Sequence, residues 1–171
     1  MGRREQIWGE SFSPLAKKVR SSYNTIIPVK EAYELIEIIC GEKGTGKTKR
    51  IISLANGISD QAKGSMVFID DDNSYMYDLG YSIRFINVTD YALNDPDMFL
   101  GFLCGLCASD FDLEYVFVDR FESVIKADLG ELQGFFAQLQ AMADQHKLHI
   151  ILSVSKGAEL LPDFMKAYSM E

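Results

Sequence analysis

An eight-residue segment of this chain has the residue types and the spacing that hold a phosphate chain. Residues 41–48 read GEKGTGKT and match the pattern G-x-x-x-x-G-K-[ST] at every fixed position. Its glycines carry no Cβ, so the backbone is free to curve around an anion and turn its N–H groups inward. Lys47 would bring a positive charge to the β- and γ-phosphates, and the Thr48 hydroxyl would be a ligand for Mg²⁺. We expect the nucleotide to contact Gly41, Glu42, Lys43, Gly44, Thr45, Gly46, Lys47, Thr48 and Lys49.

A site of this kind also needs a carboxylate near the metal, and Asp119 is the candidate. It follows residues 115–118 (YVFV), an apolar run that is typical of a buried strand. In open α/β sheets, ligands bind at the carboxyl ends of the strands, where Asp119 would lie. We therefore expect Thr48 and Asp119 to hold Mg²⁺. ATP and Mg²⁺ are the expected cofactors, and the expected catalytic residues are Lys47, Asp119 and Arg120.

Alternating apolar runs and helical patterns supply the elements that would position these residues. Short apolar runs predict strands at 35–40, 65–69, 82–88, 115–118 and 149–154. Apolar residues at helical spacing predict helices at 47–58, 96–109 and from 128 onward. Asp95 and Pro96 would cap and open the second of these helices, and Asp128 with Glu131 would open the third. The alternation predicts an α/β fold, a three-layer sandwich with a mostly parallel central sheet.

The pattern also divides the chain. Residues 1–34 are interrupted by serines and prolines, so we expect an N-terminal arm that packs on the core or extends from it. Residues 35–171 form the predicted nucleotide-binding domain, within the usual size of a single domain. We expect a short helix broken by Pro162 to close it.

A strand, GEKGTGKT, a helix and an apolar strand ending in Asp119 together resemble the P-loop NTPase superfamily, over residues 35–155. The order of elements is similar to the branch that contains AAA-type and RecA-type ATPases, and to small stand-alone bacterial ATP-binding proteins. The resemblance implies that strand 149–154 lies between the strand before the loop and the strand before Asp119. It also implies that Ser153 or Ser155, at the tip of that strand, senses the γ-phosphate.

The chain departs from that branch at two places. Members usually have Glu directly after the Asp, to polarise the attacking water, whereas this chain has Arg120 there and Glu122 two residues on. We therefore expect slow hydrolysis that a partner or self-assembly raises, with Arg120 stabilising the transition state in its own subunit or in a neighbour. The alternative is a surface Arg120 paired with Glu122. Members of the branch also usually have a fifth strand after the fourth. Residues 25–29 are a candidate for this strand, at an edge of the sheet.

Two other functions stay open: a small-molecule kinase and a non-enzymatic nucleotide-binding interaction protein. Nucleotide kinases clamp the transferred phosphate with several arginines, and beyond the loop this chain has only Arg50, Arg84 and Arg120. Arg120 in place of Glu favours the non-enzymatic alternative. The chain lacks N-K-x-D, the motif by which GTPases read the base. The segment after residue 118 also lacks the glycine of the motif D-x-x-G, so a GTPase is disfavoured.

The composition and charge of the chain indicate which partners and which cellular compartment to expect. The net charge is −8 and the pI about 4.8, which argues against general nucleic-acid binding. No apolar run reaches the roughly 18 residues of a membrane span, so we expect no membrane insertion. The N-terminus lacks the pattern of a secretory signal, so we expect a cytoplasmic protein with a possible protein partner or self-assembly.

Three further clusters have structural explanations. We interpret Cys104 and Cys107 as part of a buried helix face rather than a metal site. We interpret residues 70–72 (DDD) as a solvated acidic turn, too far from the loop to take part in its chemistry. A tyrosine group forms either a partner surface or aromatic packing at the sheet edge, and consists of Tyr75, Tyr77, Tyr81 and Tyr91.

Overall fold

The structure is a computed structural model that describes residues 35–93 and 95–170. These residues belong to one compact unit, which runs from Tyr33 to Glu171. The predicted N-terminal arm and the candidate edge strand at 25–29 lie outside the described residues.

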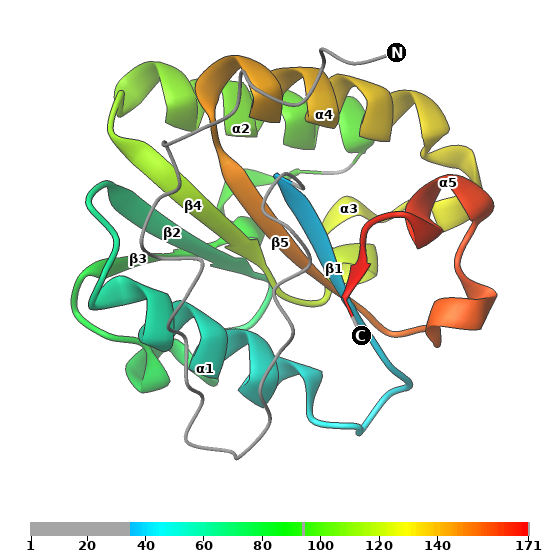
Figure 1. Ribbon diagram of the computed structural model, residues 1–171, viewed down its shortest axis with the longest axis horizontal. Helices are drawn as coiled ribbons and strands as arrows, with labels where there is room; N and C mark the ends of the chain where they lie inside the picture. The colour runs from blue at the N-terminus through cyan, green and yellow to red at the C-terminus, as the bar shows by residue number, and fades with distance from the viewer. Residues whose placement is uncertain (1–34, 94, 171) are drawn as a thin grey trace, which may run out of the picture. The chain divides into compact units, whose positions relative to one another are not determined.

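A six-stranded sheet forms the centre of this unit (Figure 1). Its order is β3-β2-β4-β5-β1-β6, and every neighbouring pair is parallel. The predicted α/β class is therefore confirmed, and β5 lies between β1 and β4 as the resemblance implied. The strands are β1 (Ile36–Cys40), β2 (Ser65–Asp70), β3 (Ile83–Asn87), β4 (Leu113–Val118), β5 (His149–Val154) and β6 (Ser169–Met170).

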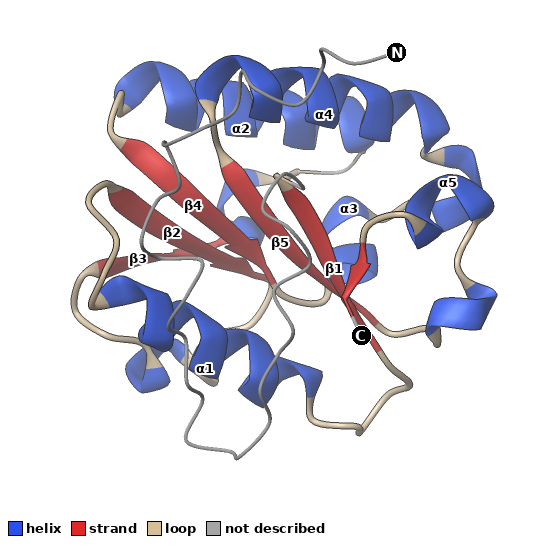
Figure 2. Ribbon diagram, in the orientation of Figure 1, coloured by secondary structure: helices blue, strands red, loops and turns tan. Residues whose placement is uncertain are grey.

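Helices cover both faces of the sheet and complete the three layers (Figure 2). Helix α1 (Lys47–Ser59) packs on one face, where Ile51 and Ala55 join a core cluster with Phe68 and Phe117 of the strands. Helices α2 (Pro96–Ser109) and α4 (Gln133–His146) cover the other face. The strands read as nearly continuous apolar runs because both faces of the sheet are buried. The remaining helical elements are η2 (Met76–Asp78), η3 (Val88–Tyr91), α3 (Phe121–Ile125), η4 (Leu129–Glu131), η5 (Ala158–Leu160) and α5 (Asp163–Lys166).

The short helix α3, which the sequence patterns did not predict, begins directly after the turn at Arg120. Phe121 anchors it, because its fully buried ring lies within 6.0–6.4 Å of the rings of Phe99, Phe135 and Phe136. These partners come from α2 and α4, so α3 is fixed to the helical layer that α2 and α4 form on one face of the sheet. This anchoring fixes the chain on one side of the Asp119–Arg120 turn.

Two sequence predictions about the second half of the chain are wrong. Asp128 caps the short 3-10 turn η4 by accepting from the Gly130 amide, and α4 begins only at Gln133. The last element of the described residues is a strand rather than a helix: after α5 the chain turns back, and β6 pairs in parallel with β1. The Ile38 amide donates to the Tyr168 carbonyl at 2.7 Å, and β6 is the strand next to β1 at this edge of the described sheet.

The N-cap of α2 gives a first testable prediction. Asp95 accepts a hydrogen bond from the Met98 amide at 2.8 Å, as its position before Pro96 indicated. Asp95→Ala removes the acceptor and is expected to lower the free energy of unfolding by about 1 kcal/mol. Asp95→Asn retains a capping oxygen and should change it by a few tenths at most, so urea unfolding of both variants isolates the cap. Equal losses in the two variants would contradict this role.

Candidate functional site

The loop between β1 and α1 has a backbone shape that depends on its glycines. Gly44 and Gly46 have φ values of 86° and 87°, in the left-handed region that residues with a Cβ rarely adopt. A Cβ on Gly41 would lie 2.7 Å from the Thr45 hydroxyl oxygen, so no side chain fits there without a shift. That hydroxyl in turn donates to the Glu42 carbonyl at 2.8 Å and closes the loop on itself.

Positive groups gather where the loop meets the start of α1. The bond from the Arg50 amide to the Gly46 carbonyl (3.0 Å) begins the helical ladder, so the amides before it have no helical partner. The Lys47 ammonium donates to the Glu42 carbonyl at 2.8 Å, which folds the side chain back over the loop. Within the described residues, Lys47 forms no ion pair with a carboxylate. Amides without a helical partner at the start of a helix, together with a lysine that forms no ion pair, are suited to binding an anion.

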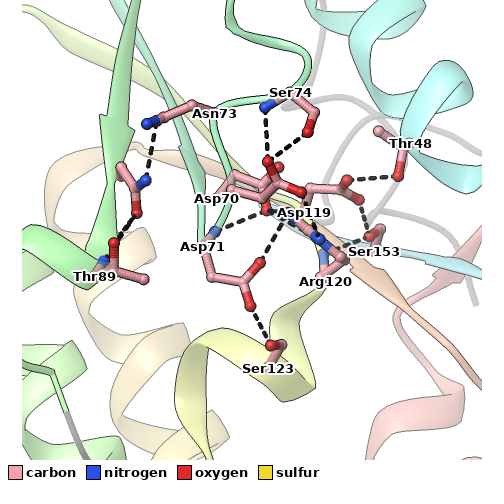
Figure 3. Close-up of polar contacts among 12 residues, drawn as sticks. Thr48, Asp70, Asp71, Asn73, Ser74, Thr89, Asp119, Arg120, Ser123 and Ser153 are labelled. Carbon is pink, nitrogen blue, oxygen red and sulfur yellow. Dashed lines mark hydrogen bonds and ion pairs between the residues drawn. The ribbon is translucent and has the colours of Figure 1, made fainter.

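Asp119 follows β4 and meets the loop, as the sequence predicted. Its carboxylate is fully buried, and its Oδ2 accepts a hydrogen bond from the Thr48 hydroxyl at 2.6 Å (Figure 3). The Ser153 hydroxyl, at the end of β5, donates to the other oxygen, Oδ1. The ends of the neighbouring strands β4 and β5 and the start of α1 thus converge on one carboxylate.

The oxygen atoms of this pair fit the preferences of magnesium. Mg²⁺ binds hard oxygen ligands, commonly one or two carboxylates together with phosphate oxygens and water. Thr48 and Asp119 supply a hydroxyl and a carboxylate in direct contact, beside the glycine-rich loop. The donor set present in the chain therefore fits Mg²⁺ bound together with a nucleotide.

Arg120 occupies an unexpected place. Its guanidinium lies 2.7 Å from Asp70, 2.8 Å from Asp71 and 3.4 Å from Asp72, at the carboxyl end of β2 (Figure 3). The alternative in which a surface Arg120 pairs with Glu122 is therefore wrong. Glu122 instead accepts from the Ser155 amide at 2.5 Å. In the sheet, β2 flanks β4 on the side away from β1, so the Arg120 side chain points away from the loop at residues 41–48.

The interpretation of residues 70–72 as a solvated turn is also wrong for its first residue. Asp70 is only 1% exposed, and burial raises its pKa to about 7. Arg120 opposes this rise by favouring the charged carboxylate, and the nearby Asp119 adds to it. Asp72 is exposed, and hydrogen bonds from Ser74 lower its pKa. The sequence held one signal for this contact, since β2 and β4 were both expected to end in Asp.

Ser153 and Ser155, which the resemblance linked to γ-phosphate sensing, differ in their surroundings. The Ser153 hydroxyl is buried, donates to Asp119, and accepts from the Arg120 amide at 2.9 Å. Ser155 is exposed, and its amide is bonded to Glu122. Ser153 is thus occupied in supporting Asp119 and the turn that follows it.

The remaining clusters do not add ligands to the site. Cys107 is buried in the core as expected, whereas Cys104 is exposed and lies 3.7 Å from the Met142 sulfur. Among the described residues, no three His, Cys, Asp or Glu side chains form a further metal-binding group. Tyr77 and Tyr81 are exposed, and Tyr91 packs at 5.4 Å on the ring of Phe102. Among the helices of the described residues, none combines the length and hydropathy of a membrane span.

Comparisons with known proteins give likenesses to solved structures only. No protein-family profile matches this chain, and no curated protein does. One similar solved structure is the flagellar accessory protein FlaH from Methanocaldococcus jannaschii, with a TM-score of 0.43 and 19% identity. The alignment covers 75% of this chain and 63% of FlaH, so the chain spans less than two thirds of that protein's length. The all-parallel sheet of this chain, with β5 between β1 and β4, is compatible with the P-loop NTPase fold.

Proposed function

We propose that this protein binds ATP together with Mg²⁺ in the loop formed by residues 41–48. The observation that supports this most is the 2.6 Å contact between the Thr48 hydroxyl and the Asp119 carboxylate. These residues are 71 positions apart, and a nucleotide site requires them to meet beside the phosphates. A glycine-rich turn with no ligand has no need of a buried carboxylate at that point.

In this proposal each part of the site has one task. The loop amides and the Lys47 ammonium hold the β- and γ-phosphates by charge-assisted hydrogen bonds. Thr48 and Asp119 hold the metal, which when bound neutralises charge on the phosphate oxygens. Ser153 keeps Asp119 in place from the neighbouring strand. Contacts from Gly41, Glu42, Lys43 and Lys49 belong to the same proposal.

We propose that hydrolysis by the isolated chain is slow, and that a protein partner or self-assembly raises it. Arg120 stands where a water-polarising Glu would be, and its guanidinium is held by three aspartates rather than directed to the loop. Glu122 is engaged with the Ser155 amide. This arrangement favours a nucleotide-dependent interaction protein over a small-molecule kinase as the alternative function.

A panel of nucleotides tests the proposal. Thermal unfolding should shift upward with ATP and Mg²⁺ and stay unchanged with adenosine, which lacks the phosphates that the loop binds. At an ATP concentration of about 100 times Kd, the expected stabilisation is about 2.7 kcal/mol. Phosphate release measured over a range of protein concentrations should be below about 1 s⁻¹, the low end of ordinary turnover. The absence of a shift with any nucleoside triphosphate would refute the proposal.

A further inference from the structure

The turn that follows Asp119 is held in an unfavourable backbone conformation. Arg120 has φ 50° and ψ 48°, the left-handed helical region, although it carries a Cβ. Residues other than glycine persist there only where the surroundings hold them. The contacts of Arg120 therefore identify what holds the turn.

The turn is held both through the Arg120 backbone and through the Arg120 side chain. The Arg120 amide donates to the Ser153 hydroxyl at 2.9 Å. The guanidinium donates through Nε and Nη2 to a single oxygen of Asp70, at 3.0 and 2.7 Å. Asp70 is the most buried of the three aspartates; Asp71 lies 2.8 Å from Nη2 but is partly exposed, and Asp72 is exposed and further away, at 3.4 Å. Asp70 is therefore the main anchor of the side chain.

The same turn fixes the direction of the Asp119 carboxylate. Ser153 bonds both the Arg120 amide and Asp119 Oδ1, so the turn and the carboxylate are linked through one hydroxyl. The other oxygen, Oδ2, meets Thr48. A turn that relaxed toward ordinary backbone angles would move Arg120 off Ser153 and turn Asp119 away from Thr48.

We propose that Asp70 is a positioning residue for magnesium binding, and that it acts through Arg120 on the direction of Asp119. This inference rests on the proposed nucleotide site but concerns only its metal-binding half. Asp70 also has a buried oxygen, Oδ2, for which the described residues supply no hydrogen-bond partner. Because Oδ2 has no such partner, the ion pair between Arg120 and Oδ1 is the main compensation for burying this carboxylate. Loss of either partner therefore disrupts the other.

The test separates metal binding from nucleotide binding. ATP affinity of purified full-length protein is measured by calorimetry in EDTA and then over a range of Mg²⁺ concentrations. Asp70→Asn, which keeps the size of the side chain, is expected to raise the Mg²⁺ concentration for half-saturation about tenfold. Affinity for ATP in EDTA is expected to remain that of the wild type, because Asp70 does not contact the loop.

Asp72→Asn is the matched control, since it removes the same charge from the same turn at an exposed position, where the contact with Arg120 is the longest of the three, at 3.4 Å. It is expected to leave both affinities unchanged. Arg120→Ala tests the other half of the pair and should raise the Mg²⁺ requirement by a similar factor. Its side chain is partly exposed, so this variant keeps the proposal testable if Asp70→Asn fails to fold.

A double-mutant cycle distinguishes action through Arg120 from direct contact with the metal. In the Arg120→Ala background, Asp70→Asn should have no further effect on the Mg²⁺ requirement. Amide hydrogen exchange at Arg120 in the ligand-free protein gives an independent readout, and should be faster in Asp70→Asn than in Asp72→Asn. An unchanged Mg²⁺ requirement, equal losses in EDTA, or additive effects in the cycle would each overturn the inference. A wild-type protein that binds no ATP would instead overturn the proposed function.

Discussion

Lys47→Ala is expected to remove at least about half of the stabilisation that ATP and Mg²⁺ confer on the protein. A hydrogen bond to a charged group contributes about 1.5–3 kcal/mol, so ATP should bind about 10- to 150-fold more weakly. At an ATP concentration of about 100 times the wild-type Kd, the stabilisation should fall from about 2.7 to between about 1.4 and 0.3 kcal/mol. Thermal unfolding with and without ATP measures this difference.

The ligand-free Lys47→Ala protein should unfold at close to the wild-type temperature. The only contact of the Lys47 ammonium with the described residues is one hydrogen bond to the Glu42 carbonyl, at an exposed site. Lys63→Ala is the control, because Lys63 is exposed and contacts Glu114 through its backbone amide rather than its side chain. An ATP-dependent shift that survives in Lys47→Ala would remove the loop from the proposed site.

Local patterns were sufficient for most of the fold. The strands β1 to β5 and the helices α1 and α2 lie within a few residues of their predicted bounds, because long apolar runs and helical spacing reflect burial directly. The glycine-rich loop and Asp119 were also found from local sequence. Their meeting at Thr48 followed from a general rule, that the carboxyl ends of parallel strands share one edge of the sheet.

The strand β6 shows where local patterns carry too little information. It has two residues, Ser169 and Met170, which is too short for any alternation to be recognised. Its pairing depends on the backbone bond between Ile38 and Tyr168 and on the turn at α5 that returns the chain to β1. A strand this short is determined by tertiary structure rather than by local sequence. In the sequence, the proline at residue 162 indicated only that a helix was interrupted.

The Asp70–Arg120 pair was missed for a related reason. The expected sheet order correctly placed β2 three positions from β1, and this distance from the loop led to residues 70–72 being treated as solvated. The same order places β2 directly beside β4, so Asp70 faces the turn after Asp119. An arginine at a left-handed turn is a further surprise, since sequence gives no indication of a positive φ at a residue other than glycine, asparagine or aspartate.

This arrangement changes the expected role of Arg120. The sequence suggested that it stabilises the phosphoryl-transfer transition state from the end of β4. The structure directs the guanidinium to the carboxyl end of β2, where Asp70 is buried against it. Stabilisation within the same subunit would require this ion pair to break first. The loss of a buried pair is costly, which agrees with the proposed slow hydrolysis of the isolated chain.

The second large effect is expected at Asp119. Asp119→Asn keeps the size of the side chain but replaces a carboxylate by a neutral amide, which is a much poorer ligand for Mg²⁺. The Mg²⁺ concentration for half-saturation of ATP binding should rise by at least about 10- to 100-fold, the range seen when groups that only support a metal ligand are lost. Calorimetric titrations of ATP at a series of Mg²⁺ concentrations give this value directly.

The affinity of Asp119→Asn for ATP in EDTA decides how the loss is interpreted. Asp119 contacts Thr48 and Ser153 rather than the amides or the lysine of the loop, so metal-free binding should stay at the wild-type level. Asp112→Asn is the matched control, since it makes the same change of charge at an exposed turn before β4. A loss confined to Asp119→Asn and to solutions containing Mg²⁺ identifies a metal ligand. Equal losses with and without Mg²⁺ would mean that the buried carboxylate serves only to hold β4, β5 and α1 together, because a distorted loop would bind the phosphates poorly whether or not the metal is present.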